Sequence, residues 1–412
     1  MTRKEKPFRG DGGSEHMAVL SKSYSDKRWL QMKKKPKTTN PKITIRSVDL
    51  FAGIGGIAVG TQEACRRLGY AHKCELANEW DESVLSVFED NLQPEVAICG
   101  DVGSLFNRGL FAKNLQELLR KKLTVVEKKL LQKYPFLAEP DLLTGGPPCQ
   151  GHSDLNNHSR RDDPRNALYY RMIRAAKVLN PKAIIIENVS TVIHSKEKVV
   201  DNSVDLLKKM GYNVKLLMIW GNEFGVPQKR KRHFLIASRI SIPDISLLEK
   251  YKLKKDRTLR WAIEDIESLA NSTTYDSPAD SDDENKKRMQ WLIDNDEYDL
   301  PNKLRPDCHK DGHNYPAVYG RMYYDLPSST ITTGFRSNGQ GRFTHPVANP
   351  ARPLTPHEGA RIQTFPDWFS FEKVGVTKMS KGIGNAVPPI LAMHIANLAI
   401  SSIIEKPKVV SE

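Results

Sequence analysis

The stretch that decides the fold is Ile43-Thr-Ile-Arg-Ser-Val-Asp-Leu-Phe-Ala52 followed by Gly53-Ile-Gly-Gly56. Apolar and polar residues alternate at its start, which predicts a β-strand that runs into a glycine-rich turn. A helical segment follows, so Gly53, Gly55 and Ala58 form the strand–turn–helix pattern of a dinucleotide-binding fingerprint. Glycine there lets the backbone approach a ligand closely. A nicotinamide cofactor, another nucleoside-containing ligand and a plain tight turn all satisfy this pattern.

Strands and helices continue to alternate from this stretch to about residue 240. Further strands are expected at 73–78, 96–99, 140–144, 183–187 and 231–238, and helices at 81–91 and 168–179. This alternation predicts an α/β fold with a doubly wound, mostly parallel Rossmann-like sheet at 43–240. Residues 104–138 are rich in Leu and Lys and are expected to form an amphipathic helical insertion with a solvated charged face.

The sequence pattern changes after residue 240. Residues 241–350 are charged and irregular, with an acidic stretch from Asp276 to Glu284, and are expected to form a second, smaller domain. Residues 351–412 return to helical and Gly/Pro-rich sequence. Polar residues interrupt the apolar run from Ile390 to Ile404, so this run is expected to be a packed helix rather than a membrane span.

The charge of the chain points to a polyanionic partner. The 412 residues carry a formal net charge of +14. Residues 1–42 hold 12 Lys or Arg and four Asp or Glu, a net of +8, which leaves +6 for the other 370 residues. This basic leader is expected to be disordered. Five scattered cysteines argue against a disulfide framework, and the polar N-terminus argues against a secretory signal.

Two strand ends carry side chains suited to a reactive site. Cys149 follows Gly145-Gly-Pro-Pro148, where two prolines fix the backbone at the C-terminal end of a strand. A thiolate presented there would be a strong nucleophile. Glu187 ends the apolar strand at 183–187, and burial there would raise its pKa and let it act as an acid near neutral pH.

Basic and acidic residues near other strand ends complete the candidate site. Gln228, Arg230 and Arg232 alternate before the strand at 231–238, so they are expected to share one face that pairs with Glu187 and binds an anion. Glu79 lies about 25 residues after the glycine-rich turn, where a ribose-binding carboxylate is found in such folds.

Taken in order, these motifs resemble those of the cytosine-C5 DNA methyltransferase family of restriction–modification type. The resemblance runs through residues 46–400, and neither the helical insertion nor the leader interrupts it. It implies a methyltransferase sheet and a target-recognition domain at 241–350. The eight motifs are Asp49–Gly56, Asn78–Asp81, Gly100–Val102, Gly145–Gln150, Glu187–Val189, Gln228–Arg232, Arg352–Pro366 and Gly382–Pro389.

The resemblance implies S-adenosyl-L-methionine as cofactor and methyl donor. Glu79 is expected on its ribose hydroxyls, Trp80 against its adenine and Asp101 at the adenine amino group. The late motif, which contains Asn385, is expected to fold back beside the cofactor. The implied cofactor-binding residues are Phe51, Gly53, Gly55, Gly56, Glu79, Trp80, Asp101, Val102, Pro147, Leu168, Asn385 and Ala386.

The resemblance also implies covalent catalysis on a cytosine flipped out of double-stranded DNA. Cys149 would attack C6, Glu187 would hydrogen-bond N3 and the exocyclic amine, and Arg232 would orient Glu187 and contact O2. Arg230 completes the implied catalytic set. The residues expected to bind DNA are Gln150, His152, Ser153, Arg165, Gln228, Thr330, Thr332, Arg336 and Arg342.

Further expectations concern metals, partners and location. No metal is expected, because Cys308, His309 and His313 lack a fourth ligand at zinc-finger spacing. The chain is expected to act as a monomer, without a membrane, and to protect DNA from a cognate restriction endonuclease that acts separately. The expected location is the bacterial cytoplasm, at the nucleoid, or the nucleus if the source is eukaryotic.

Three alternative functions remain open. A tRNA cytosine-5 methyltransferase could carry the same motifs, although the substantial region at 241–350 favours DNA. A nicotinamide-dependent dehydrogenase would explain the glycine-rich turn and leave Cys149 and Glu187 without a role. A DNA-binding protein without catalytic activity is disfavoured by the intact Cys149, Glu187 and Arg232.

Overall fold

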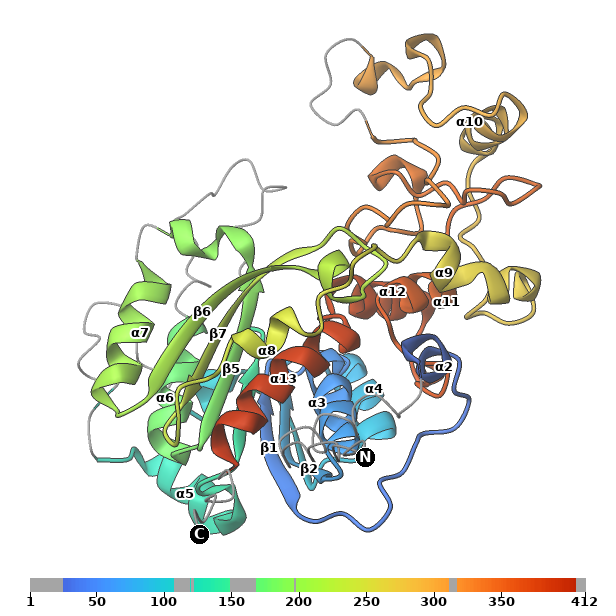
Figure 1. Ribbon diagram of the computed structural model, residues 1–412. Coiled ribbons are helices and arrows are strands. Elements are labelled where there is room, and N and C mark those ends of the chain that lie inside the picture. Colours follow the sequence, from blue (N-terminus) through green and yellow to red (C-terminus); the bar gives the residue numbers. More distant parts are fainter. Residues whose placement is uncertain are drawn as a thin grey trace, which may run out of the picture.

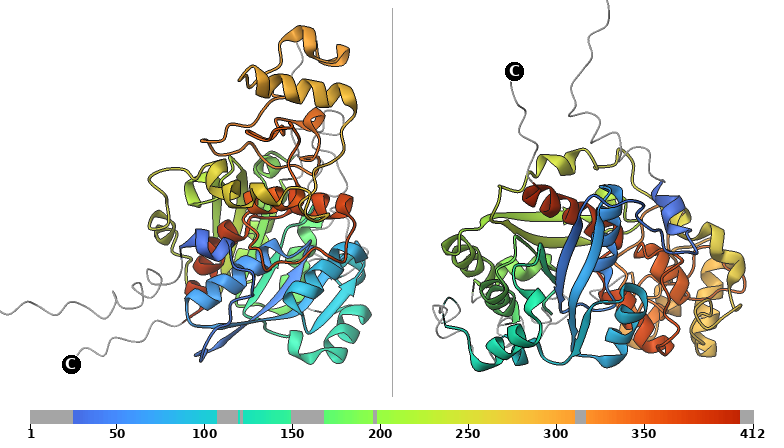
Figure 2. Two further views of the ribbon diagram at one scale, coloured as in Figure 1. Left: turned by 90° about the vertical axis from the view of Figure 1, so that its right-hand side faces the viewer. Right: turned by 90° about the horizontal axis from the view of Figure 1, so that it is seen from below.

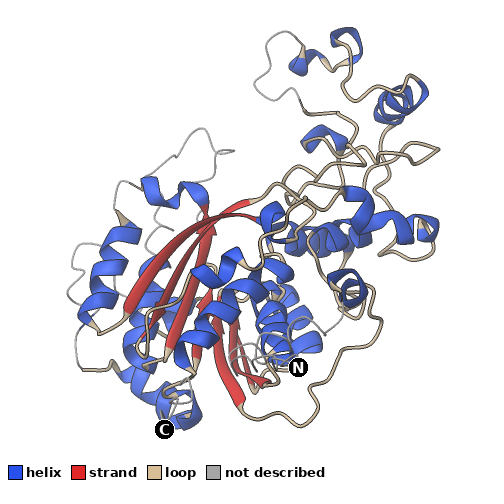
Figure 3. Ribbon diagram, viewed as in Figure 1, coloured by secondary structure: helices blue, strands red, loops and turns tan. Residues whose placement is uncertain are grey.

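The computed structural model describes residues 25–106, 119, 122–148, 168–195, 198–310 and 317–404. Figure 1 shows a central twisted sheet with helices on both faces, from which a smaller region around α10 projects. The two further views in Figure 2 show the same projection beside the sheet domain. Figure 3 shows that the strands of the described chain lie in the sheet and that the projecting region consists of helices and loops.

One seven-stranded sheet forms the centre, in the order β3-β2-β1-β4-β5-β7-β6. The first five strands of this order are parallel to one another. The strand β7 is antiparallel to both β5 and β6. The predicted α/β fold with a mostly parallel sheet is therefore confirmed. The strands are β1 (Thr44–Leu50), β2 (Ala71–Glu79), β3 (Val96–Cys99), β4 (Leu142–Gly145), β5 (Ala183–Val189), β6 (Asn213–Trp220) and β7 (Lys231–Ser238).

Helices cover both faces of the sheet and bury a separate apolar cluster on each. The helices α3, α4 and α13 contribute to one cluster, and α5, α6 and α7 to the other. This is the doubly wound arrangement that the alternation of elements predicts. The bounds are α3 (Gly56–Arg67), α4 (Glu82–Leu92), α5 (Val125–Lys133), α6 (Tyr169–Leu179), α7 (Val199–Lys209) and α13 (Pro389–Ile403).

Local sequence explains where key elements begin. Gly55 has φ of 98°, a left-handed conformation that suits glycine, and α3 starts at the next residue. The Asp81 side chain accepts hydrogen bonds from the backbone N–H groups of Ser83 and Val84 and so caps α4. The apolar α13 is buried over nearly its whole length, which confirms the predicted packed helix.

The strand β6 is an element that the sequence analysis did not predict. It lies at the edge of the sheet, yet its residues Leu216 to Trp220 form an unbroken apolar run. Leu216, Met218 and Trp220 are exposed. A strand with one solvated face ordinarily alternates apolar and polar residues. The strand β6 lacks this alternation and is not fully buried either.

The insertion at 104–138 is helical only in part and is not simply solvated. Part of it lies outside the described residues, and α5 spans Val125–Lys133. Glu127 of α5 forms a bidentate ion pair with Arg174 of α6, with N–O distances of 2.5 and 2.7 Å. Both side chains are buried, so the insertion is anchored to the sheet domain through a buried charge pair.

The prediction of a disordered leader is wrong for residues 25–42. Helix α2 spans Asp26–Leu30, and Trp29 and Leu30 are buried in the first core cluster. Asp26 forms ion pairs with Arg67 and Arg257. The charge count hid this short helix because lysines and arginines flank its two apolar residues. Residues 1–24 lie outside the described part of the chain.

The described residues that follow β7 form helices joined by loops. Leu248 and Leu259 pack into the first core cluster, whereas Leu292, Leu300 and Tyr319 form a separate small cluster. The predicted domain limits remain a prediction. The helices are α8 (Ser246–Glu249), α9 (Leu259–Ile263), α10 (Asp283–Asp294), α11 (Pro356–Ile362) and α12 (Val376–Asn385).

No single described helix has the length and apolar composition to cross a membrane, although the bent pair α12–α13 meets that test by length and composition.

Candidate active site

The candidate cofactor and catalytic residues gather at the carboxyl edge of the parallel strands. The turn at 51–56 follows β1, Glu79 ends β2 and Asp101 follows β3, while Pro147 follows β4 and Glu187 lies near the end of β5. Parallel strands that point the same way end at the same edge, where open α/β sheets bind ligands. The sequence order of the motifs thus becomes a spatial cluster.

Glu79 fixes the glycine-rich turn from the neighbouring strand. Its Oε2 accepts a hydrogen bond from the Gly53 N–H at 3.0 Å, and its Oε1 accepts bonds from the N–H groups of Trp80 and Asp81 at 3.0 and 3.2 Å. Burial raises the pKa of Glu79, while these three N–H groups oppose the rise. Oε2 accepts one bond and retains acceptor capacity for a ligand hydroxyl.

Trp80 and Asp101 stand on either side of the β2–β3 end. The Trp80 side chain is 76% exposed, which is unusual for the largest aromatic residue and leaves its ring face open to stack on a base. Asp101 Oδ1 accepts a hydrogen bond from the Gly103 N–H at 2.8 Å. The positive charge of Arg171 interacts with Asp101, and Val102 beside it is buried.

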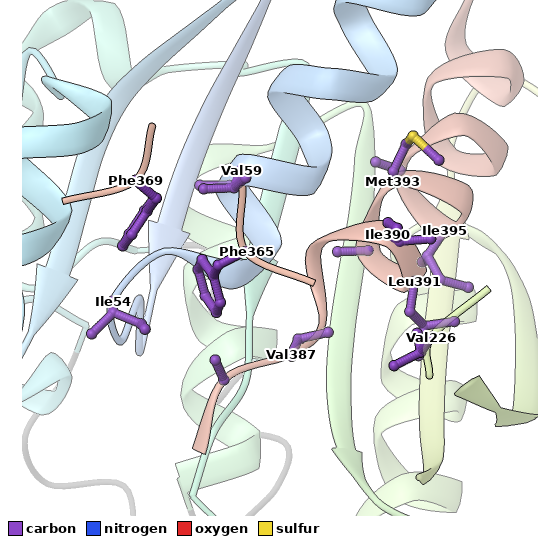
Figure 4. Close-up of a cluster of buried hydrophobic side chains, with 14 of the residues drawn as sticks. Ile54, Val59, Val226, Phe365, Phe369, Val387, Ile390, Leu391, Met393 and Ile395 are labelled. Atoms are coloured by element: carbon purple, nitrogen blue, oxygen red, sulfur yellow. The ribbon is translucent and has the colours of Figure 1, made fainter. Parts of the chain in front are cut away.

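The late motif packs directly on the glycine-rich turn. A Cβ on Gly56 would collide with the carbonyl oxygen of Val387, and a Cβ on Gly382 would collide with Ile54. Figure 4 shows Ile54 and Val387 in one apolar cluster with Phe365 and Ile390. Two segments that are about 330 residues apart in the sequence thus meet. Asn385 and Ala386 lie in the later of these two segments.

Glu187 is held by Arg232. Arg232 Nε lies 3.0 Å from Glu187 Oε1, and both side chains are mostly buried. Burial raises the pKa of Glu187, although the positive charges of Arg232 and Arg230 oppose the rise. Burial likewise lowers the pKa of Arg232, with Glu187 opposing. Both shifts have the same cause, because burial disfavours the charged form of each group.

The chain that leads to the predicted nucleophile runs beside Glu187. A Cβ on Gly146 would lie 3.2 Å from Glu187 Oε2. Asn188 donates a hydrogen bond from Nδ2 to the carbonyl oxygen of Pro147 at 3.0 Å. Cys149 itself lies outside the described residues, and the described segment that precedes it ends at Pro148.

The alternation of Gln228, Arg230 and Arg232 predicts that they share one strand face, but only Arg232 lies within β7. The strand β7 begins only at Lys231. Gln228 is fully buried and bonds to the Ile331 N–H and to Gln363. Arg230 donates to the carbonyl oxygens of Ile331, Gly384 and Ala386. Both side chains therefore join the segment around Ile331, and Arg230 also joins the late motif, to the start of β7.

The predicted DNA-binding residues are placed differently from one another. Thr330 Oγ1 donates to the Lys229 carbonyl oxygen, and Thr332 lies against Gly384. Arg342 binds the Tyr298 carbonyl oxygen and Asp299, so its charge is already partnered within the protein. Arg336 is half-buried. Outside the described residues lie Gln150, His152, Ser153 and Arg165, whereas the cofactor candidate Leu168 is the N-cap residue of α6.

The sequence analysis missed Asp49 as a structural centre of the first motif. Asp49 is buried and accepts hydrogen bonds from the Ser47 hydroxyl at 2.7 Å and the Thr144 hydroxyl at 2.5 Å. Cys74 Sγ donates to the same carboxylate at 3.3 Å. A buried carboxylate with three side-chain donors holds β1, β2 and β4 in register. An acidic residue inside an apolar strand was the available signal.

A cavity of about 240 Å³ lies away from this edge. Arg67, His394 and Tyr251 are among its lining residues, so it is enclosed by α3, α13 and the segment after α8. The candidate chemistry is not there: the Glu187–Arg232 pair and the glycine-rich turn are absent from its lining. Convergence of motifs, rather than cavity size, locates the site.

Sequence comparisons give relatives along most of the chain. The family model for C-5 cytosine-specific DNA methylase matches residues 45–401. Type II methyltransferase M1.BsuMI of Bacillus subtilis (strain 168) is 38% identical over 374 residues, which cover 90% of this chain and 84% of that protein. Type II methylase M.HgiDII of Herpetosiphon aurantiacus is 28% identical over 362 residues, covering 85% and 93%.

Solved structures share the fold. A DNA modification methyltransferase encoded within an Escherichia coli prophage gives a TM-score of 0.59 at 21% identity, covering 86% of this chain and 98% of that one. Entamoeba histolytica methyltransferase EhMeth gives 0.55 at 17% identity, covering 88% and 99%. Since the family model spans most of its length, the chain belongs to the C-5 cytosine-specific DNA methylase family of restriction–modification type.

Proposed function

We propose that this chain is a sequence-specific DNA (cytosine-5)-methyltransferase that acts on a cytosine flipped out of double-stranded DNA. The observation that carries the proposal is the buried Glu187–Arg232 pair, 3.0 Å apart, beside the Pro147–Pro148 segment that leads to Cys149. A protonated acid next to a nucleophile is the arrangement needed to activate a pyrimidine ring. Stacked duplex DNA hides the target carbon, so the base must leave the helix.

The residues at the carboxyl edge fit S-adenosyl-L-methionine. Glu79 has a free acceptor position for a ribose hydroxyl, and the exposed Trp80 ring offers a stacking face for adenine. Asp101 keeps one carboxylate oxygen for the adenine amino group. Gly53 and Gly55 have left-handed φ values of 55° and 98° and shape the turn around the cofactor. When bound, the cofactor supplies an electrophilic methyl group.

The reaction uses the side chains of this chain in sequence. The Cys149 thiolate forms a bond to C6 of cytosine, while Glu187 donates a hydrogen bond to N3 and Arg232 holds Glu187 in place. The electrons pushed into the ring make C5 nucleophilic toward the methyl group that the bound cofactor would supply, with S-adenosyl-L-homocysteine as the leaving group. A base then removes the C5 proton, and the returning electron pair expels the Cys149 thiolate. Arg230 acts on this site by fixing the start of β7.

The recognition region supplies sequence choice in this proposal. The part of this region around α10 projects from the sheet (Figure 1), and Gln228 and Arg230 join the region to the carboxyl edge of the sheet through hydrogen bonds with Ile331. The enzyme acts as a monomer on double-stranded DNA in the bacterial cytoplasm and protects it from a separately acting cognate endonuclease. A tRNA substrate is the weaker alternative, since the 38% identical relative is named as a Type II methyltransferase.

The central test is a methyl-transfer assay. The purified full chain is incubated with S-adenosyl-L-methionine labelled in the methyl group and with either duplex plasmid DNA or total tRNA. Label at C5 of cytosine in DNA is the expected result, and bisulfite sequencing then gives the target sequence. Label in tRNA alone, or no label in any DNA, would overturn the proposal.

A second test addresses the nucleophile. Cys149→Ala should abolish turnover and the covalent complex that forms with DNA containing 5-fluorocytosine at the target, because the C5 fluorine cannot leave as a proton does. Cys99→Ala, which removes an exposed cysteine at the end of β3, is the control for loss of a thiol and should still be trapped. A covalent complex that persists in Cys149→Ala would refute the assignment.

A further inference from the structure

The arginines of the recognition region and of the segment that follows it fall into two groups. Residues 241–361 contain nine arginines. Eight of them donate hydrogen bonds to carboxylate, amide or carbonyl oxygens of the protein; they are Arg257, Arg260, Arg288, Arg305, Arg321, Arg342, Arg352 and Arg361. Arg336 alone has no hydrogen bond or ion pair within the described chain, and its buried Nε is without a partner.

The partnered arginines build the scaffold of this region. Arg342 bridges to Asp299 and lies over the Tyr323 ring, and Arg321 bridges to Asp296 and lies over the Tyr298 ring. Tyr298 and Tyr323 stack with ring centroids 4.3 Å apart. The positive charges of Arg321 and Arg342 are therefore already paired with carboxylates of the protein.

Arg336 is presented by a loop that is fixed on both sides. Phe335 before it is fully buried and packs on Gly359 of α11. Ser337 after it donates its N–H to the Gly334 carbonyl oxygen at 3.0 Å. The same loop rests on the late motif, since a Cβ on Gly384 would collide with Thr332. Arg336 thus sits on a braced loop that is anchored to the catalytic edge.

Burial without an anion makes Arg336 costly in the free protein. Burial lowers its pKa, and no carboxylate opposes this shift. A guanidinium that is already partly desolvated gains most from a full negative charge, with which it forms bidentate charge-assisted hydrogen bonds. The hydrogen-bonding edge of guanine is neutral and would leave that charge uncompensated.

We propose that Arg336 binds a DNA backbone phosphate at the junction between the recognition region and the catalytic edge. This inference rests on the proposed function, because it assigns a contact with the DNA substrate. The arginine positions the DNA for the target cytosine and does not read a base. Arg336 and Arg342 are both expected from the sequence to bind DNA, and the proposal assigns the phosphate contact to Arg336.

The test compares DNA binding by Arg336→Gln and the intact chain across salt concentrations. The probes are a fluorescent duplex that contains the target sequence found by bisulfite sequencing and a duplex with that sequence scrambled. We expect about tenfold weaker binding to both duplexes. The slope of log affinity against log salt should fall by about one, as for the loss of one phosphate contact.

Two further variants make the result specific. Arg260→Gln removes an exposed charge already paired with Asp325 and should leave affinity and salt slope nearly unchanged. Arg336→Lys keeps the charge and should restore most of the salt slope. Thermal unfolding of each variant checks that folding is intact.

The outcomes separate this inference from the proposed function. Weaker binding to the target duplex alone, with the salt slope kept, would mean that Arg336 reads a base and would overturn the phosphate assignment. Unchanged binding in Arg336→Gln, while the intact chain methylates DNA, would overturn this inference only. If the intact chain neither binds nor methylates DNA, the proposed function fails as well.

Discussion

Burial shifts the protonation of both members of the Glu187–Arg232 pair toward the uncharged form. An exposed pair of this kind would be fully ionised at neutral pH. Here burial raises the pKa of Glu187 and lowers the pKa of Arg232. The neutral acid therefore persists to a higher pH than an ordinary glutamic acid, which suits the hydrogen bond to cytosine N3 that we propose for it.

A pH profile can test this role. The need for protonated Glu187 should appear as an alkaline limb, in which methyl transfer is lost as pH rises through the raised pKa of this group. The measurement is the single-turnover rate of methyl transfer from pH 4 to 9, after checking that the chain stays folded. Glu187→Gln should lower the rate on the order of 100-fold or more and remove this alkaline limb.

Arg232→Met is the informative companion variant. Arg232 opposes the rise in the pKa of Glu187, so its removal should move the alkaline limb to higher pH. The overall rate should also fall, since Glu187 loses the group that orients it. A limb that stays in place in Arg232→Met, or survives in Glu187→Gln, would show that another group titrates.

At the level of elements, the contact between the glycine-rich turn and the late motif completes the proposed cofactor site. Gly56 opens α3 and has no room for a side chain, because the Val387 carbonyl oxygen occupies the place of a Cβ. The contact sets the distance between the turn after β1 and the Asn385–Ala386 segment. A substitution here acts on the cofactor through two elements at once.

Gly56→Ala should weaken cofactor binding. The added methyl must push the late motif away from the turn, and we expect a loss of roughly tenfold or more in affinity for S-adenosylhomocysteine by isothermal titration calorimetry. Gly375→Ala is the control, since a Cβ there meets nothing within 4 Å and its φ of −63° suits alanine. Equal affinity in both variants would contradict the proposed role of the contact.

The same scale shows what the sequence could and could not predict. The central strands were predictable because a strand buried on both faces is an unbroken apolar run, as at Ala183–Ile186 in β5. The order of motifs also located Glu187 and Glu79. The strand β6 carries the same signal, an apolar run from Leu216 to Trp220, although three of these residues are exposed at the edge of the sheet, so the run alone does not distinguish an edge strand from a buried one. The contacts of Gln228 and Arg230 could not be predicted because their partners, Ile331 and Gly384, lie more than 100 residues away.

At the scale of the whole molecule, α2 fastens three distant parts of the chain together. Asp26 binds Arg67 of α3 at 2.8 Å and Arg257 at 2.6 Å. Burial alone would raise the pKa of Asp26, yet the two arginines hold it well below its usual value. Lys27 binds Asp265, and the Leu30 carbonyl oxygen accepts the Asp367 N–H. This short helix therefore bridges the sheet domain and the segment from Arg257 to Asp265.

Trp29 should be the residue that makes this bridge stable. Its side chain is only 1% exposed and packs in the first core cluster, so Trp29→Ala leaves a large cavity. We expect the free energy of unfolding to fall by about 3–5 kcal/mol in urea denaturation at pH 7. Trp220→Ala removes a tryptophan that is 42% exposed and should cost much less. If the two variants are equally stable, α2 docks too weakly to hold the regions together, and its ion pairs with Arg67 and Arg257 are surface contacts of little energetic weight.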